Sequence, residues 1–181
     1  MVWDPERFRR LEREVAETLA GNRPMKDSPY YIYLYHPRDE AETIENFTNL
    51  ASRIKKTYSA ETIWLSDILR DTIRLLGLDK PGGWEIERDR RDEVERDLRR
   101  VLPEEITRRL KESLRDKETS HCAILLRYGS LLPFVHLKSL LPSIEGVVRS
   151  TLVIPYPGEE VGRPLGLDPA EVGGYYRAKV I

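Results

Sequence analysis

The sequence predicts an α/β fold, with a mostly parallel or mixed sheet of about four to five strands covered by helices on both faces. Short apolar segments alternate with longer segments in which apolar residues recur every three or four positions. Helical stretches of about ten or more residues separate the strand-like segments, which is the length that a crossover between parallel strands requires. With 181 residues, the chain is long enough to bury one core, and we expect a single domain over residues 1–181.

The first third of the chain predicts a helix, a strand and a second helix. Asp4, followed by proline, is suited to the N-cap of a helix that ends at Gly21. Residues 30–35, YYIYLY, are apolar or aromatic throughout, as expected of a strand buried on both faces. The second helix is expected to begin at Asp39, because apolar residues then recur at steps of three and four.

The middle of the chain predicts a short strand at residues 62–65 and a helix that begins at the next Ser-Asp pair and ends at Gly77. Residues 84–117 hold 11 basic and 11 acidic residues in 34 positions, so most of this segment is expected to be solvated. We expect it to form two helices that meet near Pro103, supported by ion pairs four residues apart. Its thin apolar stripes leave open a helical projection that docks a partner.

The last third is expected to hold much of the core, because residues 118–181 contain six basic and six acidic side chains in 64 positions. Residues 121–127 and 149–154 predict two central strands, with a helix at about 133–141 between them, and the chain ends in a short strand. The turns after the two central strands are expected to depend on Gly129, Pro133, Phe134, Pro157 and Gly158. The two glycines are expected to permit a positive φ or a close approach of the backbone.

Composition argues against several classes of protein. The 30 basic and 31 acidic residues leave a net charge of −1, which does not fit a protein whose main task is to coat nucleic acid or an anionic membrane. No segment approaches about 18 consecutive apolar residues, and the charged N-terminus does not fit a signal peptide, so we expect a cytoplasmic protein. The single cysteine, Cys122, excludes an internal disulfide and a cysteine-rich zinc site.

Motifs typical of nucleotide-binding and hydrolytic enzymes are absent from the sequence. There is no G-x-x-x-x-G-K-[ST] or G-x-G-x-x-G loop, and the first strand leads instead into the bulky segment HPRDE at residues 36–40. There is no G-x-S-x-G motif, and the three histidines are too scattered for a zinc site of the H-E-x-x-H type. We therefore expect a Rossmann-like sheet without a phosphate-binding loop, and neither catalytic residues, a metal nor a cofactor.

Residues directly after strands are the remaining candidates for a site, because ligands of α/β proteins bind outside the carboxyl ends of the strands. His36, Asp67 and Glu159 could converge into a metal or acid–base site of a degenerate hydrolase or nucleotide-binding domain. In the structural alternative, Asp67 supports a helix start, Glu159 is a solvated loop acid and His36 caps a strand end. Cys122, inside an apolar strand, is expected to be buried and inert.

Two histidines and the arginine-rich helices carry weaker expectations. His121 is expected at an edge of the sheet and His136 on a helix surface. The acids and bases of residues 84–117 interleave one for one, which favours a solvated, self-paired face. A subunit that contacts DNA through these helices stays open as an alternative, and it predicts binding that depends steeply on salt.

Aromatic residues near the last loops are candidates for binding a partner. Tyr156, Tyr175, Tyr176 and Arg177 have the composition typical of protein interfaces, where tyrosine and arginine supply much of the binding energy. In the alternative, the tyrosines pack the turns on which they lie.

Three segments of the last third resemble the BrxB family, a small component of the BREX bacteriophage-defence systems. They are RYGSLLPF at residues 127–134, VIPYPGE at 153–159 and YYRA at 175–178, and both their order and their spacing agree with the family. The resemblance covers residues 123–181, and the strand at 31–35 is compatible with it.

The resemblance implies a role but no catalytic residues. It implies a non-enzymatic accessory subunit that associates with the phosphatase-like PglZ component. This subunit would help to assemble a complex with the methyltransferase and ATPase components of the system. Contact with DNA is then expected to be indirect, through the complex.

Overall fold

The computed structural model describes the backbone of residues 3–22, 29–80, 90–132, 134–160, 163–164 and 178–181. The strands are β1 (Tyr30–Tyr35), β2 (Ser59–Trp64), β3 (His121–Leu126), β4 (Thr151–Glu160), β5 (Arg163–Pro164) and β6 (Ala178–Val180). Five of them are parallel and lie in the order β2-β3-β4-β1-β6, while β5 pairs antiparallel with β4.

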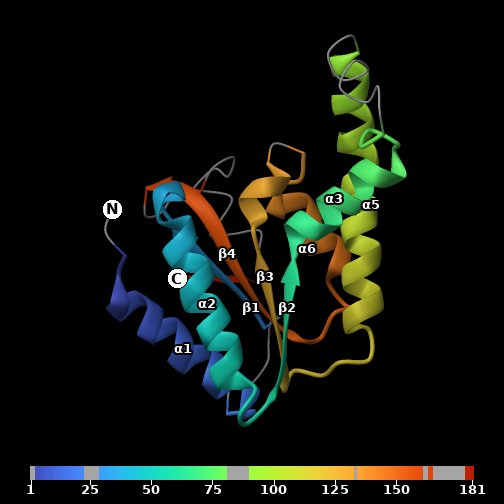
Figure 1. The fold of residues 1–181 in the computed structure, drawn as a ribbon. Helices are drawn as coiled ribbons and strands as arrows, with labels where there is room; N and C mark the ends of the chain where they lie inside the picture. The colour runs from blue at the N-terminus through green and yellow to red at the C-terminus, as the bar shows by residue number, and fades with distance from the viewer. Residues whose placement is uncertain (1–2, 23–28, 81–89, 133, 161–162, 165–177) are drawn as a thin grey trace.

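Helices cover both faces of this sheet, so the predicted α/β class is confirmed (Figure 1). The α-helices are α1 (Pro5–Leu19), α2 (Glu40–Ile54), α3 (Leu65–Leu75), α5 (Arg91–Leu114) and α6 (Leu137–Ile144). Two 3₁₀ helices, η1 (Pro37–Asp39) and η2 (Tyr128–Leu131), follow β1 and β3. Helices α1 and α2 lie on one face, and α3, α5 and α6 lie on the other. Within the described residues, no helix combines the length and the apolar character needed to cross a membrane.

Strand β1 divides the core into two parts, because its successive side chains point to opposite faces of the sheet. Tyr31, Tyr33 and Tyr35 pack on the side of α1 and α2, whereas the alternate residues pack on the side of α3, α5 and α6. All six residues of the strand are buried, as its composition predicts. Its neighbours β4 and β6 pair with it on both sides and provide backbone hydrogen bonds to this buried strand.

Helix α1 forms as the sequence predicts. The Asp4 carboxylate accepts hydrogen bonds from the amides of Glu6 and Arg7 at 3.0 and 3.1 Å, which caps the helix. The apolar residues of its predicted stripe are all buried: Phe8, Leu11, Val15 and Leu19. Gly21 follows the helix with a φ of +72°, the left-handed conformation that ends helices at glycine.

The charged segment contains one continuous helix where two were predicted. Helix α5 runs through Pro103, and a stripe of leucine and isoleucine along it is buried against the core and lies near α3 and α6. Proline inside a helix costs about 3 kcal/mol. Each buried aliphatic side chain contributes about 1.5–3 kcal/mol, so burial of the whole stripe outweighs that cost. The amino-terminal part of α5 extends beyond the rest of the fold (Figure 1).

Charged side chains tie α5 to α3. Glu105 accepts hydrogen bonds from Arg108 at 2.7 Å and from Arg109 at 2.8 Å, and Arg109 also binds the Asp71 carboxylate of α3 at 2.8 Å. The bonds from Arg108 and Arg109 lower the pKa of Glu105 from 4.5 to about 2, against the effect of burial. The pair of Glu105 and Arg109 is one of those predicted from the spacing of four residues.

The variant Glu105→Gln is expected to be less stable than the wild type by about 0.5–1 kcal/mol at neutral pH, because it keeps the shape and loses the charge. A lowered pKa stabilises the fold fully above pH 4.5, and this stabilisation is lost as the pH falls toward 2. Urea unfolding, measured from pH 7 to pH 2, should show the difference in free energy of unfolding between the wild type and Glu105→Gln falling toward zero between pH 4.5 and pH 2. The matched control, Glu104→Gln, changes an exposed carboxylate of the same helix. A deficit for Glu105→Gln that persists unchanged at pH 2 would contradict an ionic origin.

Strand β4 continues through the segment in which a turn was predicted. Pro157 pairs with Tyr35 of β1, and Gly158 pairs with Pro164 of β5, so neither forms the predicted turn. The described pairing of β4 with β3 ends at Val153, whereas its pairing with β1 continues to Pro157. Prolines are tolerated there because this part of the strand pairs with β1 and has no described pairing on its β3 side.

The turn after β3 also differs from its prediction. Gly129 lies in η2 without a positive φ, and a Cβ atom there would meet Pro157 Cγ at 3.5 Å, an ordinary contact. The residue with a positive φ is Arg127, so this turn does not need its glycine for either predicted reason. Phe134 has its expected place in the turn, because its amide donates to the Leu131 carbonyl at 2.7 Å. Pro133 lies outside the described residues.

Two further boundaries differ by a few residues. Strand β2 begins at Ser59, and Leu65, predicted as its end, is fully buried as the first residue of α3. The helix predicted at 133–141 begins at Leu137, because η2 occupies the first residues after β3.

Candidate functional site

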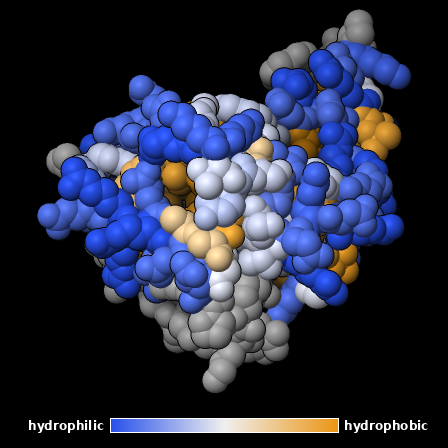
Figure 2. Space-filling model, turned by 90° about the horizontal axis from the view of Figure 1, so that it is seen from below, coloured by the Kyte–Doolittle hydropathy of each residue, from blue (hydrophilic) through white to orange (hydrophobic). Residues whose placement is uncertain are grey.

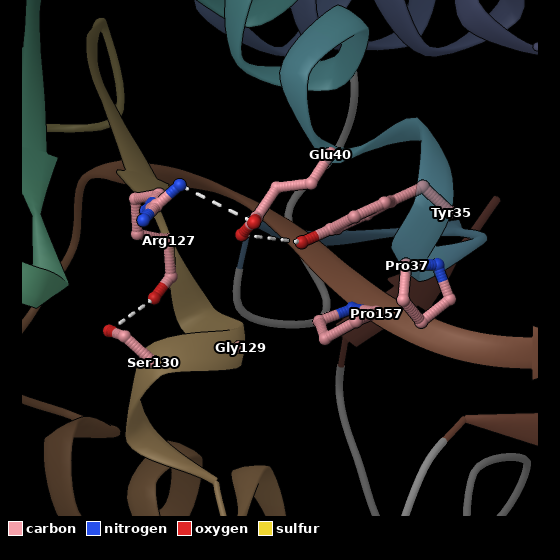
Figure 3. Close-up of a pocket in the computed structure, with 7 residues that line it drawn as sticks. All are labelled: Tyr35, Pro37, Glu40, Arg127, Gly129, Ser130 and Pro157. Atoms are coloured by element: carbon pink, nitrogen blue, oxygen red, sulfur yellow. Dashed lines mark hydrogen bonds and ion pairs between the residues drawn. The ribbon is translucent and has the colours of Figure 1, made fainter.

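A pocket of about 300 Å³ lies at the carboxyl edge of the sheet (Figure 3). The described residues that line it are Tyr35, Pro37, Glu40, Arg127, Gly129, Ser130 and Pro157. They come from the end of β1 and the helices that follow it, from the turn after β3, and from β4. The pocket therefore brings together three segments that are far apart in the sequence.

The topology of the sheet places a crevice at this point. After β1 the chain enters α2 on one face, whereas after β3 it leads through η2 to α6 on the other face. Strand β4 lies between β3 and β1, so the two connections diverge on either side of it. In α/β proteins, ligands bind outside the carboxyl ends of the strands, and this pocket lies at those ends.

A charged pair lies at the pocket. The Arg127 guanidinium and the Glu40 carboxylate are 3.3 Å apart, and the Tyr35 hydroxyl donates to the same carboxylate at 3.4 Å. Burial raises the pKa of Tyr35, and the charge of Glu40 raises it further, so the phenol keeps its proton at neutral pH. The side chains of Arg127 and Glu40 are 42% and 34% exposed, which leaves both within reach of a ligand.

The backbone at Arg127 adopts a conformation that is unfavourable for arginine. Its φ of 64° and ψ of 38° are left-handed, which costs roughly 1 kcal/mol or more for a residue with a Cβ atom. The hydroxyl and the amide of Ser130 both donate to the Arg127 carbonyl, at 2.7 and 3.1 Å. These two bonds hold the turn, and the guanidinium of Arg127 points toward Glu40 (Figure 3).

The three residues predicted to converge at this edge have local roles where the structure describes them. Asp67 lies in the first turn of α3 and pairs with Arg70 at 3.0 Å. His36 Nδ1 accepts the amide of Arg38 at 3.2 Å and caps η1. The side chain of Glu159 lies outside the described residues. Asp67 has the role of its structural alternative, whereas His36, which that alternative placed as the cap of a strand end, caps the 3₁₀ helix that follows the strand.

The described residues contain no group of three or more histidine, cysteine, aspartate or glutamate side chains that could hold a metal ion. Cys122 is completely buried, and burial raises the pKa of its thiol to about 12. A protonated, inaccessible thiol is inert, which confirms the expectation for this residue.

His121 is buried, although an edge position was predicted for it. Its ring lies between Ser59 Oγ, 2.8 Å from Nδ1, and Glu61 Oε1, 2.9 Å from Nε2. The two partners lie two residues apart on β2, so they share a face, and Ser59 is the register partner of His121. The prediction failed because the pairing of β2 with β3 cannot be read from either strand alone. His136 is half-buried and directly precedes α6.

Tyr156 was predicted to contribute to a docking surface, and this prediction is wrong. Its side chain is completely buried, and its ring lies 4.9 Å from that of Tyr128. Because β4 continues past Ile154, the alternation of the strand carries Tyr156 into the same core as Ile154. Tyr175, Tyr176 and Arg177 lie outside the described residues, and their proposed role stays a prediction.

Sequence reasoning did not select the charged pair of the pocket. Glu40 and Arg127 lie 87 positions apart in the sequence, and no spacing rule connects them. A signal was present, because Arg127 directly follows β3 and Glu40 lies soon after β1. These positions point to a shared site only when the order of the strands is known, because that order places the ends of β1 and β3 on either side of β4.

A comparison with protein families supports an assignment for this chain. A family model described as "BREX protein BrxB" matches residues 62–181, which are 120 of the 181 residues of the chain. The matched region includes the end of β2 from residue 62 onward, β3, β4 and the pocket residues Arg127, Gly129, Ser130 and Pro157. Searches among curated proteins and among solved structures give no match.

Proposed function

This chain belongs to the BrxB family, which makes it a component of a BREX phage-defence system, and we propose that it is a non-enzymatic assembly subunit of that system. The partner that we propose is the PglZ-like component, a member of the phosphatase superfamily. The complex would further include the ATPase and methyltransferase components and would act in the cytoplasm. Family membership is the observation that carries this proposal.

The charge arrangement of α5 supports indirect contact with DNA. Binding to DNA, a polyanion, needs a surface with a surplus of positive charge that neutralises several phosphates. On α5, Arg91 pairs with Glu95, Arg100 pairs with Asp97, and Arg108 pairs with both Glu105 and Glu112. Along α5 the acidic side chains equal the basic ones in number, so the helix has no positive surplus for a polyanion, which favours an assembly role over DNA contact.

Polar side chains cover much of the described surface. Seen from below, the molecule is mostly hydrophilic, and apolar residues are visible in small areas between charged ones (Figure 2). Among the described residues, the large apolar side chains that are exposed are Trp64, Leu75 and Val147. Where a protein surface is largely polar, tyrosine and arginine are the residues that commonly supply much of the binding energy of an interface. We therefore keep Tyr175, Tyr176 and Arg177 as the proposed docking residues.

Co-expression tests this function. The full chain carrying an affinity tag is expected to capture the PglZ-like protein of the same locus as a stoichiometric complex, with the mass measured by light scattering. The double variant Tyr176→Ala/Arg177→Ala is expected to weaken capture at least about tenfold, since loss of interface anchors costs about 2 kcal/mol or more. Its circular dichroism spectrum should remain that of the wild type.

Arg115→Ala, which removes an exposed basic side chain after α5, is the matched control and should capture normally. Unchanged capture by the double variant would remove both residues from the interface. Failure of the folded wild type to capture the partner would overturn the assembly proposal itself.

A further inference from the structure

We propose that the pocket at the carboxyl edge binds a mononucleotide, with its phosphate on Arg127 and its ribose hydroxyls on Glu40. The pocket is formed by this chain alone, so the inference does not depend on the assembly role. It adds a small-molecule ligand to a protein for which the assembly proposal requires none.

The position and size of the pocket fit this class of ligand. It lies outside the carboxyl ends of β1 and β3, which is the edge at which α/β sheets bind nucleotides. Its volume of about 300 Å³ lies at the lower end of the range of ligand sites, which suits one nucleotide better than a dinucleotide. Pro37 and Pro157 supply apolar surface against which a sugar or a base can pack (Figure 3).

Arg127 has the chemistry that a phosphate requires. A guanidinium carries five N–H donors, and its contact with Glu40 at 3.3 Å engages one nitrogen of the group. The remaining donors suit the bidentate binding of phosphate oxygens, which is a common role of arginine. Arg127 is the only basic residue among the described residues that line the pocket. A single cation among the described lining residues favours a monophosphate over a triphosphate.

Glu40 has the chemistry that ribose requires. A carboxylate offers about four acceptor positions, and the Tyr35 hydroxyl and Arg127 occupy two of them. The others can accept hydrogen bonds from adjacent hydroxyls, and an acidic residue after a strand binds ribose in this way in other α/β sheets. Tyr35 fixes one carboxylate oxygen by donating to it, so Glu40 is oriented before any ligand binds.

The left-handed backbone of Arg127 supports a binding role. Strained residues occur most often at functional sites, where the surrounding structure holds them in place. Here Ser130 holds the strained turn through two hydrogen bonds to the Arg127 carbonyl. The turn has no glycine loop whose amides could surround a phosphate, so the charged side chain of Arg127 must supply that contact.

Titration calorimetry of the full chain tests the proposal with AMP, GMP, adenosine, ribose 5-phosphate and inorganic phosphate. One molecule of AMP or GMP is expected to bind per chain, at least about tenfold more tightly than adenosine or inorganic phosphate. Ribose 5-phosphate is expected to fall between them, because it carries both groups that the charged pair would bind.

Two variants separate the two contacts. Arg127→Asn removes the guanidinium but keeps a residue type that tolerates the left-handed conformation, and it should weaken AMP binding at least about tenfold. Glu40→Ala should lower the preference for AMP over inorganic phosphate at least about tenfold, because the ribose loses its acceptor while the guanidinium stays. Arg38→Gln, an exposed charge in the adjacent η1 that does not line the pocket, is the control and should bind AMP normally.

Three results would overturn the proposal. They are no binding of AMP or GMP to the folded wild type, equal affinity for AMP and inorganic phosphate, and AMP binding that neither Arg127→Asn nor Glu40→Ala changes. Capture of the PglZ-like protein is measured with the same two variants. Loss of nucleotide binding with normal capture would support the pocket as a ligand site, whereas failure of capture by the wild type concerns the assembly proposal alone.

Discussion

Tyr156→Ala is expected to lower the free energy of unfolding by about 3–5 kcal/mol, as other large aromatic residues do when they are removed from a core. The ring is completely buried beside Tyr128, in the part of the core covered by α3, α5 and α6. Removing it leaves a cavity between β4 and η2 that the surrounding side chains close only in part. Urea unfolding followed by circular dichroism measures the loss.

Tyr156→Phe is the matched control, because it keeps the ring and removes a single oxygen atom. It is expected to cost far less than the alanine variant. If Tyr156→Ala left stability unchanged but abolished capture of the partner, the residue would belong to an interface and its place in the core would be refuted. The measurement therefore decides between the docking role first predicted for Tyr156 and the core position that the structure gives it.

Phe47→Ala is expected to cost about 3–5 kcal/mol on the opposite face of the sheet. Phe47 is fully buried, and its ring meets the rings of Phe8 at 5.1 Å and Tyr33 at 5.4 Å in edge-to-face arrangements. Such ring pairs add about 0.5–1.5 kcal/mol beyond the area that they bury. The substitution removes the one aromatic ring that α2 contributes to this cluster among the described residues.

The change is measured by urea unfolding against Asn49→Ala, which alters an exposed position of the same helix. That control is expected to stay within about 0.5 kcal/mol of the wild type. A loss for Phe47→Ala no larger than that of the control would mean that α2 does not pack on the sheet through this residue.

Predictions were correct for elements whose ends and burial depend on residues within the same segment. Helix α1 has its cap, its apolar stripe and its final glycine within one segment, so local chemistry fixes both of its ends. Strand β1 consists of aromatic and aliphatic residues alone, which indicates burial on both faces whatever its neighbours are. Cys122 lies inside an apolar strand and is buried for the same reason.

Predictions failed where packing or pairing with a segment far away in the sequence overrides the local sequence pattern. Local rules predict that Pro103 ends a helix. Helix α5 nevertheless continues through it, because its apolar stripe packs against the core on both sides of the proline. The prolines after Ile154 indicate the end of a strand, yet pairing with β1 extends β4 past them. His121 looks like an edge residue until the register of β2 places Ser59 and Glu61 beside its ring.

By itself, the sequence determined the α/β class, the buried central strands and the resemblance to the BrxB family that the family match confirms. These properties follow from residue type and from spacing within single segments. The tertiary structure alone decided the order β2-β3-β4-β1-β6, and with it the meeting of Glu40 with Arg127 in the pocket. The physical reason is that strand order comes from packing and pairing between segments far apart in the chain, and no periodicity within one segment encodes it.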